Sequence, residues 1–274
     1  MEVRPAPRPR TSIKSRREEL EIKLEALQKD YAELHTSIFE AAQVHRRLCA
    51  PRLVRCGDFE IASEIFAVRH LAGDFFTVRN VNHGVVMALG DICGKGLAAG
   101  MWTTHLVGLV ANRTHVSSDP EQIVAGVNRD LCLMASAVPL ASLFLARLDP
   151  VNGILEYCSA GHPPAMLLRA NGKLEFLSEG GLLLGVVAAA PYIRGRVELG
   201  PGDVLLTYSD GLLESLNKSE EEFGYSRIEN QLRSARNDSA DAVLFSVLGA
   251  VQDFAATKPL MDDMTVAIVR RNIH

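Results

Sequence analysis

Segments of strand length and segments of helix length occur in separate groups from about residue 58 onward. Alternating or wholly apolar runs predict strands at 59–66, 75–81, 85–89, 141–148, 154–159, 165–169, 173–177, 194–199, 204–208 and 264–270. Helices are expected in pairs, at 97–112 with 120–135 and at 225–235 with 240–255. Asn171 followed by Gly172 is typical of a hairpin turn. This grouping favours an α+β layered sandwich over a repeated β-α-β unit, in which strands and helices alternate.

The N-terminal part of the chain has a different pattern. Residues 1–14 are basic and proline-rich, and we expect a disordered tail there. Residues 15–50 are expected to form one long helix that ends before Pro51, and residues 51–274 a separate domain. Apolar positions of the helix follow a heptad: Leu20, Leu24, Leu27, Tyr31, Leu34, Ile38, Ala41, His45 and Leu48. This seam predicts a parallel coiled-coil homodimer; the alternative is an amphipathic helix packed on its own domain.

Composition narrows the functional class. Apolar residues make up 47% of the 274 residues, which suits a globular domain with a sizeable core. The net charge of −4 gives no reason to expect a nucleic acid partner. No apolar run has membrane-spanning length, and the N-terminus lacks the apolar stretch of a secretory signal. Five cysteines without a Cys-x-x-Cys pair indicate a reducing, cytoplasmic setting and neither a disulfide framework nor a zinc site: Cys49, Cys56, Cys93, Cys132 and Cys158.

Four aspartates in separate motifs are the candidate functional residues. Asp74 lies in Ala-Gly-Asp-Phe-Phe, Asp91 in Gly-Asp-Ile-Cys-Gly-Lys-Gly, Asp210 in Tyr-Ser-Asp-Gly, and Asp262 in Asp-Asp-Met-Thr. Each lies at the edge of an apolar run, where a carboxylate is costly unless something compensates its charge. Mg²⁺ and Mn²⁺ prefer oxygen ligands of this kind. The four motifs therefore suggest a metal site assembled from distant parts of the chain.

Each motif also has a purely structural interpretation. Asp91 could cap the following helix, Asp74 could occupy a bulge or turn, Asp210 a turn, and Asp262 a loop before a strand. The glycine-rich segment at 90–96 is not a nucleotide P-loop, because it lacks four residues between the first glycine and Gly-Lys and has no Ser or Thr after the lysine.

His162, followed by two prolines, could act as a general acid or base, but we favour a role in shaping a turn. The sequence has no Gly-x-Ser-x-Gly elbow, so it gives no support for a Ser-His-Asp triad. Cys93 and Cys132 are expected to be small buried residues and not nucleophiles.

Taken in order, six motifs resemble one family. They are Ala-Gly-Asp-Phe-Phe, Gly-Asp-Ile-Cys-Gly-Lys-Gly-Leu-Ala-Ala, Ser-Ala-Gly-His-Pro-Pro, Gly-Gly-Leu-Leu-Leu-Gly-Val, Leu-x-Pro-Gly-Asp-Val-Leu-Leu-Thr-Tyr-Ser-Asp-Gly and Asp-Asp-Met-Thr. Residues 48–271 are similar to the SpoIIE/RsbU-type branch of the metal-dependent serine/threonine protein phosphatases, which share the protein phosphatase 2C-like fold. The resemblance implies a four-layer α-β-β-α sandwich after the N-terminal helix, with a two-metal site at one end.

The resemblance also implies residue roles. Asp74 would bind one Mn²⁺ or Mg²⁺ ion, and Asp91 would bridge both ions, with the Ile92 carbonyl as a further ligand. Asp210 and Asp262 would hold the other ion. The two cations would clamp the phosphate oxygens and activate a bridging water, so that Asp91 is catalytic through the metals and the water.

The sequence departs from the family pattern at three positions. Thr77 stands where the family has a second aspartate, which could weaken metal affinity. Ala72 stands where the family has glycine, and Cys93 where the wider superfamily often has the histidine of Asp-Gly-His. No histidine acid would then be available beside Asp91.

The resulting prediction is a cytoplasmic phosphoserine/phosphothreonine protein phosphatase of bacterial signalling, acting in stress response and sigma-factor regulation. By resemblance its substrate would be a phosphorylated STAS-domain anti-anti-sigma factor. The alternative is a non-catalytic or weakly active interaction module of the same fold that acts through its coiled coil.

Overall fold

The computed structural model describes residues 13–49, 53–82, 84–134 and 139–273. The chain divides into two compact units, residues 1–43 and residues 44–274. The helices of the described residues are α1 (Ile13–Cys49), α2 (Leu97–Val116), α3 (Pro120–Leu133), α4 (Asp210–Leu213), α5 (Gly224–Ala235) and α6 (Ala240–Ala255). The predicted tail up to residue 12 and Pro51, at the predicted end of the long helix, lie outside the described residues.

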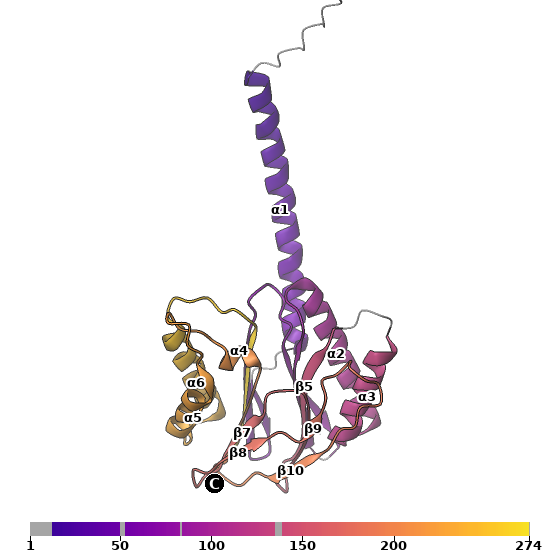
Figure 1. The fold of residues 1–274 in the computed structure, drawn as a ribbon, viewed down its shortest axis with the longest axis vertical. Coiled ribbons are helices and arrows are strands. Elements are labelled where there is room, and N and C mark those ends of the chain that lie inside the picture. The colour runs from indigo at the N-terminus through magenta and orange to yellow at the C-terminus, as the bar shows by residue number, and fades with distance from the viewer. Residues whose placement is uncertain (1–12, 50–52, 83, 135–138, 274) are drawn as a thin grey trace, which may run out of the picture. The chain divides into compact units, whose positions relative to one another are not determined.

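Two antiparallel sheets form the centre of the second unit (Figure 1). The first sheet has the order β1 (Leu53–Cys56), β2 (Phe59–Phe66), β12 (Met264–Arg271), β11 (Val204–Tyr208), β7 (Ala165–Leu168) and β8 (Leu174–Leu177). The second has the order β10 (Gly195–Glu198), β6 (Ile154–Ala160), β5 (Ala141–Asp149), β4 (Gly84–Ile92) and β3 (Phe75–Val81). The short β9 (Gly180–Gly181) pairs with β6 in parallel.

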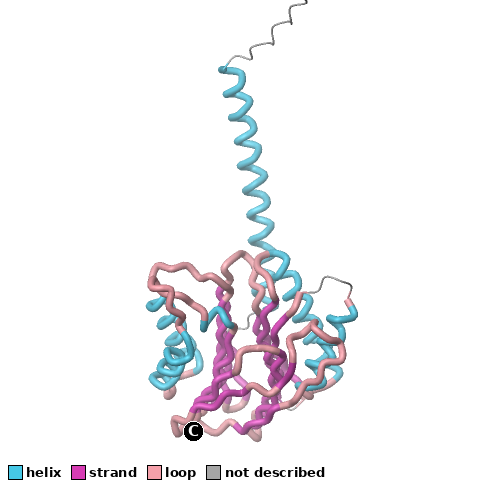
Figure 2. Tube along the Cα trace, in the orientation of Figure 1, coloured by secondary structure: helices cyan, strands magenta, loops and turns pink. Residues whose placement is uncertain are grey.

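Three apolar clusters hold the layers together. One lies between the sheets and includes Phe59, Phe76 and Leu205. A second joins the β12-β11 face to α5 and α6, and a third joins the β4-β5 face to α2 and α3. Figure 2 shows the resulting order of helices, strands, strands and helices. The α-β-β-α sandwich expected from the sequence is therefore the fold that forms.

Alternation along the strands assigns each residue to one of these clusters. In β4, Val85, Met87 and Leu89 face the other sheet, whereas Val86 and Ala88 face the helices. Because side chains of a strand alternate between faces, Asp91 continues the row that points between the sheets. The predicted strand at 85–89 is therefore too short, since β4 runs on through Asp91 to Ile92.

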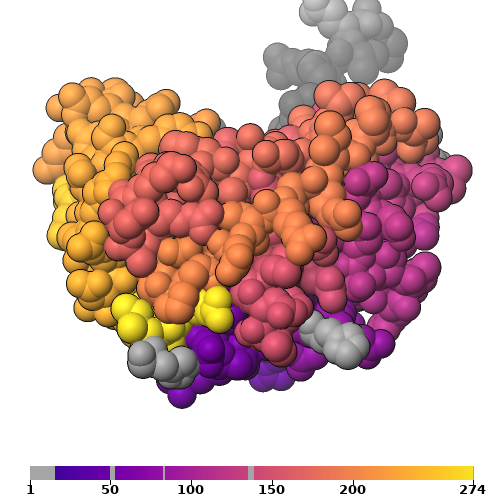
Figure 3. Space-filling model, turned by 90° about the horizontal axis from the view of Figure 1, so that it is seen from below, coloured from indigo at the N-terminus to yellow at the C-terminus, as the bar shows by residue number. Residues whose placement is uncertain are grey.

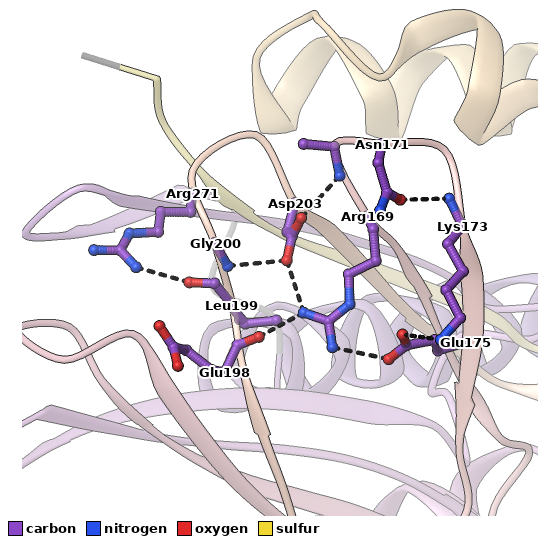
Figure 4. A network of polar contacts seen from close by, with 10 residues as sticks. Arg169, Asn171, Lys173, Glu175, Glu198, Leu199, Gly200, Asp203 and Arg271 are labelled. Atoms are coloured by element: carbon purple, nitrogen blue, oxygen red, sulfur yellow. Dashed lines mark hydrogen bonds and ion pairs between the residues drawn. The ribbon is translucent and has the colours of Figure 1, made fainter.

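A polar network fixes the end of the sandwich where the chain terminates (Figure 4). Arg169 donates to the carboxylates of Asp203 at 2.9 Å and Glu175 at 2.8 Å. Asp203 in turn accepts from the backbone N–H groups of Ala170 and Gly200. Figure 3 looks onto this end and shows the C-terminal residues, coloured yellow, beside the orange segment around residue 200. The network joins the turns around residues 170 and 201, and we infer that it stabilises this end of the sandwich.

The first unit consists of a helical segment whose seam residues are exposed. Leu20, Leu24, Leu27, Tyr31 and Leu34 are each 54–67% exposed. Leaving large apolar side chains in water at helical spacing is typical of a helix that associates with a partner. Among the described residues, no helix combines the length and apolarity needed to cross a lipid bilayer.

Candidate metal centre

All four predicted aspartates come from chain segments that end or begin at the same end of the sandwich. Asp91 is the penultimate residue of β4, and Asp74 directly precedes β3, which pairs with β4. Asp210 opens α4 two residues after β11, and Asp262 lies two residues before β12, the neighbour of β11. The first pair belongs to one sheet and the second pair to the other, so the site lies between the sheets. In Figure 1, α4 marks the end of the sandwich opposite the C-terminus.

Asp74 is the most buried of the four, with 1% of its surface exposed. Its Oδ2 accepts hydrogen bonds from the Ser209 hydroxyl at 2.6 Å and the Thr265 hydroxyl at 2.7 Å. Burial and, after it, the charge of Asp91 raise the pKa of Asp74 well above its usual value, and the two hydroxyls only partly oppose this. The carboxyl is thus fixed in position by the opposite sheet.

The other carboxyls repel one another. Burial and the nearby Asp210 raise the pKa of Asp91 to about 6. Burial and the charge of Asp262 raise the pKa of Asp210. The raised pKa values of these carboxyls result first from burial and second from neighbouring negative charge, and a bound cation offsets both effects. The donor set consists of hard oxygen atoms and fits Mg²⁺ or Mn²⁺.

Lys95 supplies the positive charge nearest to Asp262. Its Nζ lies 2.8 Å from Oδ2 of Asp262 and donates to the Met261 carbonyl at 2.6 Å. In the described parts of the chain, no three Asp, Glu, His or Cys side chains are gathered closely enough to hold an ion as they stand. In this structure the Asp262 carboxylate is therefore paired with a lysine and not with the other three aspartates.

Asp263, the neighbour of Asp262, has a different role. Its Oδ1 accepts from the backbone N–H of Val68 at 2.7 Å, and its Oδ2 from that of Gly73 at 2.6 Å. Both oxygens are thus used to anchor the loop that carries Asp74. Sequence reasoning missed this role, because nothing in Asp-Asp-Met-Thr distinguishes a buried carboxylate from an exposed one.

Gly73 belongs to the same anchored loop. A Cβ atom at this position would come within 3.1 Å of the Ile92 carbonyl oxygen and 3.2 Å of the Gly94 carbonyl oxygen. A side chain would therefore crowd the backbone next to Asp91. The Ile92 carbonyl lies close to the loop, and its predicted role as a metal ligand stays a prediction.

One family model matches most of the domain. The model, described as "Stage II sporulation protein E (SpoIIE)", matches residues 82–272. The chain belongs to the SpoIIE family.

Two known proteins are similar to this SpoIIE-family chain in sequence. "Phosphoserine phosphatase RsbU" of Bacillus subtilis is 23% identical over 245 residues, which cover 88% of this chain and 72% of RsbU. "Protein IcfG" of Synechocystis is 23% identical over 235 residues, which cover 74% of this chain. The chain spans only 36% of the length of IcfG.

Two solved structures illustrate the shared fold. The SiaA-PP2C domain of Pseudomonas aeruginosa has a TM-score of 0.76 at 17% identity, covering 88% of this chain and 98% of that domain. The catalytic domain of the serine/threonine protein phosphatase PstP, solved with two manganese ions, has a TM-score of 0.59 at 15% identity, covering 78% of this chain and 99% of that one. The predicted protein phosphatase 2C-like fold is confirmed.

Two departures of this SpoIIE-family chain from the family pattern can now be placed. In β3, Phe76 faces the other sheet and Phe75 faces the helices, so alternation puts Thr77 on the helix side. A carboxylate at this position would not face Asp91, and its absence removes no donor from the cluster.

Cys93 was expected to be buried, and that is wrong, because it is exposed beside Asp91. Partial burial of its sulfur, and after it the charges of Asp91 and Asp210, raise the pKa of Cys93, which keeps it a thiol.

A cleft of about 510 Å³ opens beside the carboxylates. Its lining contains acidic, apolar and hydroxyl side chains: Asp91, Cys93, Ser142, Gly161, His162, Pro163, Leu183, Asp210, Leu213, Glu214 and Tyr225. Burial lowers the pKa of His162 to about 3. The ring is therefore neutral near pH 7 and unsuited to deliver a proton, in agreement with the structural role favoured from the sequence.

The crowded carboxyls give the metal-free protein a pH dependence. The pKa of Asp91 is higher in the folded protein than in the unfolded chain, so folding favours the protonated carboxyl. The resulting stabilisation is present below pH 4 and is lost as the pH rises through about 6. In EDTA, the unfolding free energy of wild type should fall by about 1 kcal/mol between pH 5 and pH 8. The unfolding free energy of Asp91→Asn should not show this fall. Urea unfolding of both proteins at each pH measures this difference. A constant difference between the two proteins would show that Asp91 titrates normally.

Proposed function

We propose that this chain is a Mn²⁺- or Mg²⁺-dependent protein phosphatase that hydrolyses phosphoserine or phosphothreonine. The observation that carries the proposal is the set of Asp74, Asp91, Asp210 and Asp262 at one end of the sandwich, with raised pKa values at the first three. Groups whose pKa values are strongly shifted at a cleft are typical of functional sites. The similarity to a phosphoserine phosphatase supports the same reaction.

The proposed roles follow the positions of the residues. Asp74 would hold one metal ion, Asp91 would bridge two, and Asp210 and Asp262 would hold the second, with the Ile92 carbonyl as a further ligand. When bound, the ions supply Lewis acidity and a water of lowered pKa. Ser209 and Thr265 fix Asp74, and Asp263 fixes the loop before it. These contacts hold a carboxylate ready for an ion without a large rearrangement of the backbone.

We further propose that the substrate is a phosphorylated protein of a bacterial signalling pathway, a STAS-domain anti-anti-sigma factor. Similarity to RsbU and membership of the SpoIIE family support this assignment. The five free cysteines fit a reducing cytoplasm. Residues 51–274 would be the phosphatase domain, and residues 15–50 a helix that couples it to other domains.

The direct test is hydrolysis of a phosphoserine peptide by the purified chain. Activity should be lost in EDTA and restored by Mn²⁺. Calorimetric titration with Mn²⁺ adds a readout that needs no turnover. Metal binding without phosphate release would favour the alternative of a non-catalytic interaction module, and absence of both would overturn the proposed site.

The exposed heptad seam predicts a parallel homodimer through residues 20–48. Leu20, Leu24, Leu27, Leu34 and Ile38 are good seam residues, and Tyr31 is a poorer one that would keep the dimer adjustable. His45, the other poor seam residue, is only 6% exposed in the single chain, so the exposed part of the seam ends before it. Leu27→Glu with Leu34→Glu should give a monomer with altered activity and an intact fold, because charges cannot be buried in the seam. Light scattering at micromolar concentration measures the mass, with Glu25→Gln as an exposed control. A monomeric wild type would contradict the dimer.

A further inference from the structure

Ser142 is the cross-strand neighbour of Asp91. In the register of β4 and β5, Asp91 lies opposite Ser142. Phe144, two residues along β5, belongs to the cluster between the sheets, so Ser142 points to that side as well. Directly opposed residues have Cβ atoms about 4.5–5.5 Å apart. The Ser142 hydroxyl is therefore within reach of any group bound at Asp91, and it lines the same cleft.

The His162 ring holds this hydroxyl in place. Oγ of Ser142 lies 2.7 Å from Nδ1 of His162. The ring is 6% exposed, and the turn that carries it is tied by hydrogen bonds from Ser159 Oγ to the His162 carbonyl and from Tyr208 Oη to the Pro164 carbonyl. A rigid, buried ring that makes one hydrogen bond to a serine restricts the rotamer of that serine.

The other ring nitrogen indicates the direction of this hydrogen bond. Nε2 is buried and makes no hydrogen bond of normal length and angle among the described residues, although the Tyr208 backbone lies close enough to the ring to oppose in part the lowering of its pKa by burial. A neutral ring carries one N–H, and a buried N–H without an acceptor is rarer in proteins than an unfilled lone pair. A proton on Nδ1 donates to Ser142 Oγ at 2.7 Å, whereas a proton on Nε2 would have only a poorly placed backbone acceptor, so we assign the proton to Nδ1. The Ser142 O–H is then free to donate into the cleft.

The cleft needs such a donor. Its lining includes Asp91, Asp210 and Glu214 and contains no arginine or lysine among the described residues. An incoming phosphoryl group would meet neutral donors as well as bound cations. Ser142 and Tyr225 are the lining side chains with a hydroxyl, and Ser142 is the one paired with Asp91 across the strands.

We propose that the Ser142 hydroxyl donates a hydrogen bond to a phosphoryl oxygen of the substrate, and that His162 is the positioning residue that orients it. This inference rests on the proposed phosphatase function. It makes Ser142 a substrate-binding residue and leaves proton transfer to other groups.

The experiment compares Ser142→Ala, Ser142→Thr and His162→Ala with wild type in Mn²⁺. For a phosphoserine peptide, Ser142→Ala should lower kcat/KM by about 10- to 100-fold, as expected for one hydrogen bond to a charged group. Binding of inorganic phosphate to the Mn²⁺-loaded protein should weaken by a similar factor, and Mn²⁺ affinity should stay unchanged. Ser142→Thr should restore most of the loss. His162→Ala should weaken phosphate binding without adding to the Ser142→Ala defect in the double variant.

Ser234→Ala is the matched control, since it removes an exposed hydroxyl that bonds only within helix α5 and does not line the cleft. It should keep phosphate affinity within about twofold of wild type. The inference would be overturned by normal phosphate binding in Ser142→Ala, or by ¹⁵N shifts that place the His162 proton on Nε2. In either case an active wild type would still support the proposed phosphatase function. A wild type that binds Mn²⁺ but releases no phosphate would instead refute the proposed function.

Discussion

Asp91→Asn should abolish phosphatase activity, with a fall in kcat/KM on the order of 10²- to 10³-fold or more, the cost of removing one electrostatic stabiliser from an active site. Asp91 lies at the centre of the carboxyl cluster, because the charges of Asp210, Asp262 and Asp263 all act on it. Removing its charge should reduce affinity at both proposed ion positions. Steady-state hydrolysis of a phosphoserine peptide and calorimetric titration with Mn²⁺ measure the two effects.

The same substitution should have the opposite effect on stability. The raised pKa of Asp91 means that its ionised form is disfavoured in the folded metal-free protein. Asp91→Asn should therefore unfold at higher urea concentration than wild type at pH 8 in EDTA. Asp253→Asn, an exposed change on α6, is the control and should alter neither property. Full turnover by Asp91→Asn would remove Asp91 from the proposed mechanism.

The sequence predicts the layers of the fold well, because each depends on local pattern. The strands at 59–66, 75–81 and 204–208 and the helix at 240–255 have the predicted bounds. Capping chemistry explains part of this: the Ser239 side chain accepts from the Ala242 N–H at the start of α6, and that of Asp119 from the Glu121 N–H at the start of α3. Some short elements escape such reasoning, among them β1, β9 and the single turn of α4, since few residues signal them.

Contacts between residues on distant strands could not be predicted from the sequence. The hydroxyls on Asp74 come from residues 135 and 191 positions away, and Ser142 meets His162 only because β5 and β6 pair. Likewise, the departure at Thr77 looked damaging until the alternation of β3 put that side chain on the helix side. Motif spacing identifies which carboxylates share a site, but register decides which other groups reach them.

Asp262 and Asp263 are adjacent carboxylates whose substitution should have different consequences. Asp262 is 44% exposed and paired with Lys95, a pair whose loss costs little stability. Asp263 is 4% exposed, and its two oxygens satisfy two backbone N–H groups. Removal of this acceptor leaves two donors without their partner, and hydrogen bonds to a charged group contribute more than neutral ones.

Asp263→Ala should therefore lower the free energy of unfolding by about 3 kcal/mol and also weaken Mn²⁺ binding, because the loop that carries Asp74 loses its anchor. Asp263→Asn keeps one acceptor oxygen and should fall between Asp263→Ala and wild type. Asp262→Asn should lose activity and keep its stability within about 1 kcal/mol of wild type. Urea unfolding and Mn²⁺ titration of the three variants measure this contrast. Equal stability of Asp263→Ala and wild type would show that the loop holds its position without the carboxylate, and Asp74 would then depend on Ser209 and Thr265 alone.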